Sequence, residues 1–379
     1  MKKVWYAPNK FESYGEEEIK AVEECLRDGW LAGFGPRSIE FEEKIARRFG
    51  KLYGVFVNSG SSACLLAIAS LDLPKGSEII TPACTFSTTL APIIQLGYKP
   101  IFVDVGLNTY VPEIIDIIKV ITDNTKAIML PNLIGNKPDW NCLREALEVI
   151  GRDEIILIED SADTITFTEE SDISTTSFYA SHVITAGGQG GMVMFNNPKL
   201  RDKALQYRDW GRVGNNSEEI NERFNHNVDG IPYDFKFLYG VLGYNMKCSE
   251  MNAAFGLVQL KRFSKFEQIR RDNIERYLEN LKNVPEITLP DDSIKPNWLA
   301  VPLQTERRLE LLTFLEENNI QTRVTFAGNV TRHPIYREYL QEFKNSDIIM
   351  KDGFLLGAHH GMGLNDVDYV CSKIKNFFK

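Results

Sequence analysis

The amino-acid sequence predicts an α/β protein with a mostly parallel central sheet in a large domain and a smaller C-terminal α/β domain. Short apolar runs such as residues 126–130 and 155–158 are typical of parallel strands that are buried on both faces. Segments with helical spacing of apolar residues alternate with these runs, as they do in α/β folds. With 379 residues, 43% of them hydrophobic, the chain can form a large core. We expect the large domain to cover residues 1–260 and the small domain residues 261–379.

The predicted elements of the first half alternate between helix and strand. Three segments have helical spacing of apolar residues, namely residues 14–30, 41–49 and 142–150. A fourth helix, rich in Ala and Leu, opens at Ser59 and runs to Leu71. Five short apolar runs are predicted strands, namely residues 55–58, 78–82, 101–105, 126–130 and 155–158.

The second half begins with a less regular stretch. Residues 213–240 have few long apolar runs, so we expect an extended loop or a hairpin excursion there. From residue 253 to 281 the pattern becomes helical and charged, and this helix is a candidate link between the domains. The remaining residues predict a strand at 298–303, a helix at 306–318 and a final helix from Asp366.

Composition excludes several classes of protein. The net charge of -9 argues against a nucleic-acid or anionic membrane surface. No apolar run is long enough to span a membrane, and the first residues lack the core of a signal peptide, so we expect a cytoplasmic protein. The six cysteines have no paired ligand spacing, so we expect neither a metal site nor an iron–sulfur cluster.

Two segments follow predicted strands and carry polar groups suited to a ligand. Ser59-Gly60-Ser61-Ser62 opens a helix, and a helix N-terminus offers free amides and a positive dipole end to a phosphate. Such a segment is also an ordinary helix cap. Asp160 ends an apolar strand, where α/β enzymes place ligands, and Asp163 follows it. Each carboxylate is also a candidate helix cap or surface ion-pair partner.

The order of these segments, together with Ser177, His182 and the glycine run 187–191, resembles the active-site region of the DegT/StrS-type sugar aminotransferase superfamily. These pyridoxal phosphate (PLP) enzymes act on nucleotide-linked keto sugars. The resemblance implies PLP fold type I, like aspartate aminotransferase, with PLP bound in the large domain. In that family the residue five places after the serine is the lysine that binds PLP covalently. Here it is His182, and an imidazole moves protons near neutral pH but does not hold PLP in a stable covalent bond.

The resemblance also implies the cofactor contacts. We expect a phosphate site, an aromatic stacked on the ring and a carboxylate that keeps the pyridine nitrogen protonated. The cofactor is then PLP or its aminated form, pyridoxamine phosphate (PMP), held without a covalent bond. Asn245 resembles a residue that reaches the cofactor phosphate of a neighbouring subunit, which implies a homodimer with shared active sites. The implied cofactor-binding residues are Gly60, Ser61, Ser62, Phe86, Asp160, Asp163, Ser177 and Asn245.

Several features favour a lysine-lacking branch of the family. Residues 320–332 look like a segment typical of GDP-4-keto-6-deoxymannose 3-dehydratase and the related CDP-sugar 3-dehydrase, and Lys247 stands where many aminotransferases have arginine. This implies C3 deoxygenation of a nucleotide-linked 4-keto-6-deoxy sugar, with L-glutamate as amino donor and His182 as the catalytic base. Arg323, Asn329 and Arg332 are candidate substrate contacts, since guanidinium groups pair bidentately with phosphate. Surface or inter-domain salt bridges would explain either arginine equally well.

The chain also departs from the family pattern. The glycine run 187–191 lacks the usual glutamate, and Phe235 follows Tyr233-Asp234 where the dehydratases have a histidine. His226, His359 or His360 are possible replacements. Clustered cysteines are absent from residues 213–240, which disfavours a reductase-coupled radical route. Two alternatives remain open: a nucleotide-sugar aminotransferase with a non-covalently held cofactor, and a catalytically silent binding protein.

Overall fold

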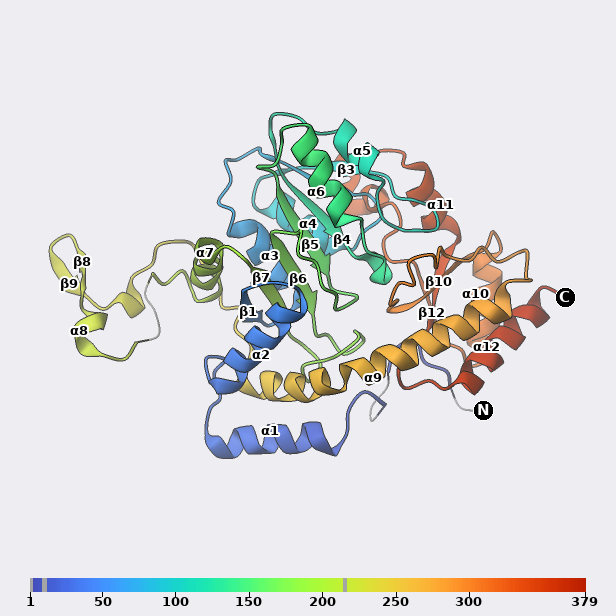
Figure 1. Cartoon of the computed structure of the whole chain (residues 1–379), viewed down its shortest axis with the longest axis horizontal. Helices are drawn as coiled ribbons and strands as arrows, with labels where there is room; N and C mark the ends of the chain where they lie inside the picture. Colours follow the sequence, from blue (N-terminus) through green and yellow to red (C-terminus); the bar gives the residue numbers. More distant parts are fainter. Residues whose placement is uncertain (1–2, 9–11, 214–216) are drawn as a thin grey trace.

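The computed structural model describes residues 3–8, 12–213 and 217–379. A seven-stranded sheet lies between two layers of helices, and a smaller domain with its own sheet packs beside it (Figure 1). The first described residues, 3–8, and the C-terminus lie on the small-domain side. The predicted α/β class with a mostly parallel central sheet is therefore confirmed.

The central sheet has the strand order β1-β7-β6-β5-β4-β2-β3. Strand β7 is antiparallel to both of its neighbours, and the other pairs are parallel. The strands β5 and β6 therefore end at the same edge, and residues that follow them meet there. The strand bounds are β1 (Tyr53–Val57), β2 (Glu78–Pro82), β3 (Lys99–Val103), β4 (Thr125–Pro131), β5 (Ile156–Ser161), β6 (Ile173–Ser177) and β7 (Gly191–Phe195).

Helices cover both faces of this sheet because successive strand residues point to opposite sides. On one face, Val55 and Ile79 pack with α3, α4 and α7. On the other, Phe56 packs with α2 and the first half of α9, while Ile80 packs with α5 and α6. The bounds are α2 (Pro36–Arg48), α3 (Gly60–Ala69), α4 (Ser87–Gln95), α5 (Ile114–Lys119), α6 (Trp140–Val149), α7 (Pro198–Arg208) and α9 (Glu250–Leu281). Helix α1 (Glu16–Asp28) lies along α9 (Figure 1).

The small domain has a three-stranded antiparallel sheet of order β10-β12-β11. Its core includes Ile274 and Tyr277 from the second half of α9, and also Val4, which pairs with Ile320. The division at residue 260 stays a prediction, and α9 runs through that position without a break. The bounds are β10 (Ala300–Gln304), α10 (Arg308–Glu317), β11 (Thr322–Val324), α11 (Lys344–Asp352), β12 (Gly353–Gly357) and α12 (Leu364–Phe377).

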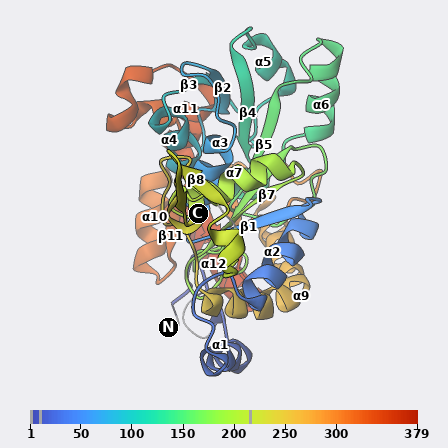
Figure 2. The same cartoon turned by 90° about the vertical axis from the view of Figure 1, so that its left-hand side faces the viewer.

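The excursion predicted at residues 213–240 projects away from the body (Figures 1 and 2). It contains the short helix α8 (Ile220–Arg223) and a hairpin of β8 (His226–Val228) and β9 (Ile231–Tyr233). Residues 214–216 lie outside the described part of the chain. In the described part, no helix is long and apolar enough to cross a membrane.

Candidate active site

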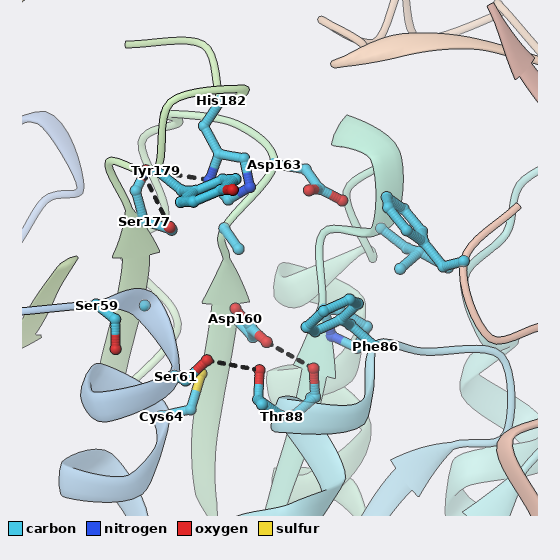
Figure 3. Close-up of a pocket in the computed structure, with 16 residues that line it drawn as sticks. Ser59, Ser61, Cys64, Phe86, Thr88, Asp160, Asp163, Ser177, Tyr179 and His182 are labelled. Atoms are coloured by element: carbon cyan, nitrogen blue, oxygen red, sulfur yellow. Dashed lines mark hydrogen bonds between the residues drawn. The ribbon is translucent and has the colours of Figure 1, made fainter. Parts of the chain in front are cut away.

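A cavity of about 310 Å³ opens where strands β5 and β6 end, between the large domain and Phe326 of the small domain. Figure 3 shows Ser61 and Asp160 in its lower part and Tyr179 and His182 in its upper part. Seven of the predicted site residues line it together: Gly60, Ser61, Phe86, Asp160, Asp163, Ser177 and His182. The convergence follows from the sheet topology, because the segments that carry them are adjacent strand ends and helix starts.

The N-terminus of α3 forms one wall of the cavity. Ser59 caps the helix, since its Oγ accepts a hydrogen bond from the Ser62 N–H at 3.1 Å. Ser62 is engaged in this cap, and its own hydroxyl donates a hydrogen bond to Asn58 Oδ1 at 2.7 Å. A Cβ on Gly60 would lie 2.6 Å from the Ser177 Cβ, so only glycine permits this close approach. The two predicted phosphate contacts, the helix start and Ser177, are thus adjacent.

Asp160 is a buried carboxylate that has no cationic partner among the described residues. Its Oδ2 accepts a hydrogen bond from the Thr89 hydroxyl at 2.7 Å, and its Oδ1 accepts one from Thr175 at 3.4 Å. Burial raises the pKa of Asp160, against these hydrogen bonds. Within the described ranges no Lys, Arg or His forms an ion pair with it. A protonated pyridine nitrogen would supply the missing charge, so the residues present fit a pyridoxal cofactor.

Asp163 is 8% exposed and lies in the upper part of the cavity, at the level of Tyr179 (Figure 3). Its Oδ2 accepts a hydrogen bond from the backbone N–H of Ile134 at 2.8 Å. Ile134 has a φ of 65°, in the short turn that follows β4. Burial and the nearby charge of Asp160 together raise the pKa of Asp163 to about 7, despite the opposing hydrogen bond from Ile134. This carboxyl group is therefore able to exchange a proton near neutral pH.

His182 lies in the turn after β6, five residues beyond Ser177. Its Nδ1 is 3.4 Å from the carbonyl oxygen of Ser177, and its ring meets Tyr179 edge-on. If Nδ1 carries the proton, it donates to that carbonyl and leaves Nε2 unprotonated. Burial lowers the pKa of His182 to about 4, so the imidazole is neutral at physiological pH. A neutral imidazole in a cavity is an available proton acceptor.

Two aromatic rings that contact each other line the cavity. Phe86, at the start of α4, is 53% exposed although it borders a large core. The Phe326 ring meets it edge-on, with 6.3 Å between the ring centroids. An exposed aromatic face of this kind is suited to stack on a planar ring.

Five predicted residues do not line the cavity: Ser62, which is engaged in the cap of α3, and Asn245, Arg323, Asn329 and Arg332, which lie elsewhere. Asn245 is exposed and pairs with Asp209, at the base of the excursion. Arg323 is exposed on β11, and its guanidinium lies over the ring of Tyr6. The structure therefore does not bring either residue into the site of this chain.

Asn329 and Arg332 are engaged in local structure. Asn329 is 0% exposed, and its amide donates to Asp347 at 2.8 Å and to the Gln341 carbonyl at 3.0 Å. Arg332 pairs bidentately with the same Asp347, with an Nη2–Oδ2 distance of 2.8 Å. In this structure Asn329 is sealed from any substrate, so its predicted contact has no support here.

The proposed replacements for the missing histidine lie in three different places. His226 is in the hairpin, where its ring meets Phe235. His359 is buried, with its Nε2 3.1 Å from the Trp5 carbonyl oxygen. His360 stacks on Phe266 of α9. Among the described residues no group of three His, Cys, Asp or Glu side chains is placed to hold a metal ion.

Sequence reasoning missed several residues that line the cavity. Thr88 and Thr89 lie within one helical turn of Phe86, and Tyr179 lies between Ser177 and His182. Phe326 lies in the segment predicted to bind substrate. Their closeness in sequence to the predicted site residues was the signal that could have identified them. Leu133 reaches the cavity through the turn after β4, which no sequence pattern indicated.

Comparison with known proteins gives consistent matches along the whole chain. Residues 12–375 match the DegT/DnrJ/EryC1/StrS aminotransferase family. The chain is 35% identical to the lipopolysaccharide biosynthesis protein RfbH of Salmonella typhimurium, over 96% of this chain and 90% of that protein. It is also 35% identical to a dTDP-4-dehydro-2,6-dideoxy-D-glucose 3-dehydratase of Saccharopolyspora spinosa, over 96% and 84%. A relative 28% identical, over 98% and 99%, is a GDP-perosamine synthase of Escherichia coli O157:H7.

The fold is similar to that of solved structures of the same kind. One is the GDP-4-keto-6-deoxy-D-mannose-3-dehydratase of Escherichia coli with bound hydrated PLP, with a TM-score of 0.86 and 27% identity, over 98% of this chain and 100% of that one. The expected PLP fold type I is therefore confirmed. The roles of the individual site residues stay predictions.

Proposed function

Because the chain belongs to the DegT/DnrJ/EryC1/StrS aminotransferase family, we propose that it removes the C3 hydroxyl of a nucleotide-linked 4-keto-6-deoxy sugar. L-glutamate would be the amino donor, and the product would be a 3-deoxy keto sugar for surface polysaccharide biosynthesis. The observation that carries this proposal is His182, which stands in the lysine position and lines the same cavity as Asp160 and Ser177.

The residues that would hold the cofactor are divided between two ends of the cavity. The α3 amides and Ser177 would bind its phosphate, Phe86 would stack on its ring, and Asp160 would pair with its pyridine nitrogen. Bound without a covalent link, PLP or PMP would supply an electron sink for breaking the bond between sugar C3 and its hydroxyl oxygen. Of the described residues that line the cavity, none is a lysine that could compete for the cofactor.

His182 would move the proton. A neutral imidazole with Nε2 free accepts a proton from carbon, and its low pKa then makes the protonated form a ready donor to the departing hydroxyl. The carbonyl of Ser177 fixes the ring through Nδ1. General acid–base catalysis of this kind is worth about 10²–10⁴ in rate.

A nucleotide-sugar aminotransferase is the second candidate. The relative named as a GDP-perosamine synthase favours it, since it matches this chain over almost its full length. A site without a lysine can still transfer an amino group, but each turnover must then retain a cofactor that nothing holds covalently. We also propose a cytoplasmic homodimer, in which the exposed Asn245 reaches the partner's cofactor phosphate.

The test is an incubation of the purified protein with PLP, L-glutamate and GDP-4-keto-6-deoxymannose, followed by mass spectrometry of the sugar. We expect loss of the C3 oxygen and release of ammonia, with the His182→Lys variant inactive in this reaction. Replacement of the ketone by an amine, in step with 2-oxoglutarate, would assign the protein to the aminotransferases. An unchanged sugar, with no PMP binding by the folded protein, would favour a silent binding protein.

A further inference from the structure

Helix α9 carries an arginine on its buried, apolar side. Arg270 follows Phe263 and Phe266 and precedes Ile274 at helical spacing, and it is 1% exposed. Its Nη1 donates to the carbonyl oxygen of Leu299 at 2.8 Å. Its Nε and Nη2 are also buried, and neither has a hydrogen-bond partner among the residues that the structure describes. Buried donors are rarely left unmet, so these two N–H groups indicate a ligand.

The two free nitrogens lie on the same edge of the guanidinium, and this edge matches a carboxylate. The same molecule shows what the edge binds. Arg276 holds Asp368 through Nε at 2.7 Å and Nη2 at 2.8 Å. Arg332 holds the two oxygens of Asp347 through the same two nitrogens. The parallel N–H bonds give a carboxylate bidentate recognition.

Arg270 lies beside the cavity, on its Asp163 side. Its Leu299 partner also donates its N–H to the Ile134 carbonyl at 2.6 Å, and the Ile134 N–H donates to Asp163. The guanidinium charge helps to lower the pKa of His182 and of His360. Arg270 is thus within electrostatic range of the proposed base and is linked by backbone hydrogen bonds to an acidic group of the cavity.

His360 is a second side chain with unmet hydrogen-bonding capacity at this place. Its ring stacks on Phe266, one turn from Arg270, with 3.8 Å between centroids and an interplanar angle of 12°. Neither ring nitrogen has a partner in the described part of the chain. Burial keeps the pKa of His360 well below its ordinary value, so the ring is neutral and can donate one hydrogen bond.

We propose that Arg270, with His360 beside it, forms the subsite for a carboxylate of the amino donor. The inference rests on the proposed use of L-glutamate and deepens it. The free edge is sealed from bulk solvent, which suits a small carboxylate better than a nucleotide diphosphate. The donor reaches it by displacing Tyr6 or His360, which are both half-buried and electrostatically coupled to Arg270.

The experiment compares Arg270→Lys and Arg270→Gln with Arg276→Gln. Arg276→Gln is the matched control, since it removes the same nitrogens from the same helix where Asp368 already occupies them at the surface. Three quantities are measured for each variant. They are the L-glutamate dependence of PLP conversion to PMP, the conversion of the keto sugar by enzyme supplied with PMP, and the affinity for glutarate by calorimetry.

We expect both Arg270 variants to raise the KM for L-glutamate about 10- to 100-fold, the range for losing a charge-assisted bidentate pair, and to weaken glutarate binding similarly. Arg276→Gln should change neither. Arg270→Lys keeps the positive charge that helps to lower the pKa of His182. The rate of its PMP-supplied reaction should therefore fall much less than the rate of its reaction with L-glutamate. An unchanged glutarate affinity in a folded Arg270→Lys, or equal losses in both reactions, would overturn the inference.

The design also separates this inference from the proposed function. Conversion of PLP by L-glutamate is common to the dehydratase and to the aminotransferase. If the wild-type protein aminates PLP but leaves the C3 hydroxyl in place, the proposed function fails while the Arg270 comparison is still decided. If Arg270→Gln does not fold, Arg270→Lys alone decides it.

Discussion

Two regions were predicted to contact small molecules, but only one of them has its predicted side chains in the cavity. The strand-end wall, formed by Asp160, Asp163, Ser177 and His182, converges on one cavity. The segment 320–332, which carries Arg323, Asn329 and Arg332, contributes Phe326 to that cavity, but these three polar side chains lie outside it. Residues at parallel strand ends are brought together by topology alone, whereas polar residues in a loop are also free to build the loop.

The largest expected effect tests the strand-end wall. His182→Asn keeps a polar side chain but removes the group that accepts a proton, so we expect the rate of C3 deoxygenation to fall about 10²–10⁴-fold. The measurement is single-turnover conversion of the keto sugar by enzyme supplied with PMP. A variant with near wild-type rate would show that the wall places the substrate but does not move the proton.

Asp163 should make the stability of the cofactor-free protein depend on pH. Its pKa rises from 3.8 to about 7 on folding, so its protonated form is favoured in the folded state. Stability is therefore highest below about pH 4 for this group and falls as pH rises toward 7, by about 1.4 kcal/mol for each pKa unit of difference. Asp163→Asn should flatten this dependence in urea unfolding across the same pH window. If the unfolding free energy of Asp163→Asn kept the wild-type pH dependence, the raised pKa of Asp163 would be contradicted.

Asn329 should matter for stability rather than for activity. Asn329→Ala removes four hydrogen bonds made by a fully buried amide, and we expect a loss of about 1–3 kcal/mol in unfolding free energy. The KM for the nucleotide sugar should stay unchanged in the folded fraction. A rise in KM without a stability loss would restore the original substrate prediction.

Arg332 should show the smallest effect. Its partly exposed pair with Asp347 is screened by solvent and contributes little to stability, so Arg332→Gln should change the unfolding free energy and the KM only slightly. The alternative is that Arg332 binds the diphosphate of the substrate, and titration of the Arg332→Gln variant with the nucleoside diphosphate tests it. Clearly weaker binding would mean that Arg332 releases Asp347 to hold the diphosphate.

The sequence predicted those parts of the fold and the site that depend on local pattern. Strand β5 and Asp160 near its end were predicted because an apolar run is followed directly by two acidic residues. Strands β6 and β7 were missed. The first is polar, Ile173-Ser174-Thr175-Thr176-Ser177, although it is buried, and the second begins within a glycine run. Their polar or small residues are accommodated by neighbours that are distant in sequence.

Arg270 was missed for a different reason. In a charged helix, one arginine draws no attention, although it interrupts an apolar stripe that continues through Ile274 and Tyr277. The break in periodicity was visible in the sequence. The sequence does not show that Nη1 of Arg270 donates to the carbonyl oxygen of Leu299, 29 positions away, while its other side-chain nitrogens keep no partner among the described residues. Only the folded chain shows this.

Helix α9 has a consequence for recombining this chain with its relatives. At 32 residues it is about 48 Å long, and it belongs to both cores. A chimera joined anywhere inside it would graft one half of the stripe onto a foreign packing surface. The stretch 282–299 is the better junction. Since Val4 pairs with Ile320, the segment that carries Val4 must come from the same parent as the C-terminal part.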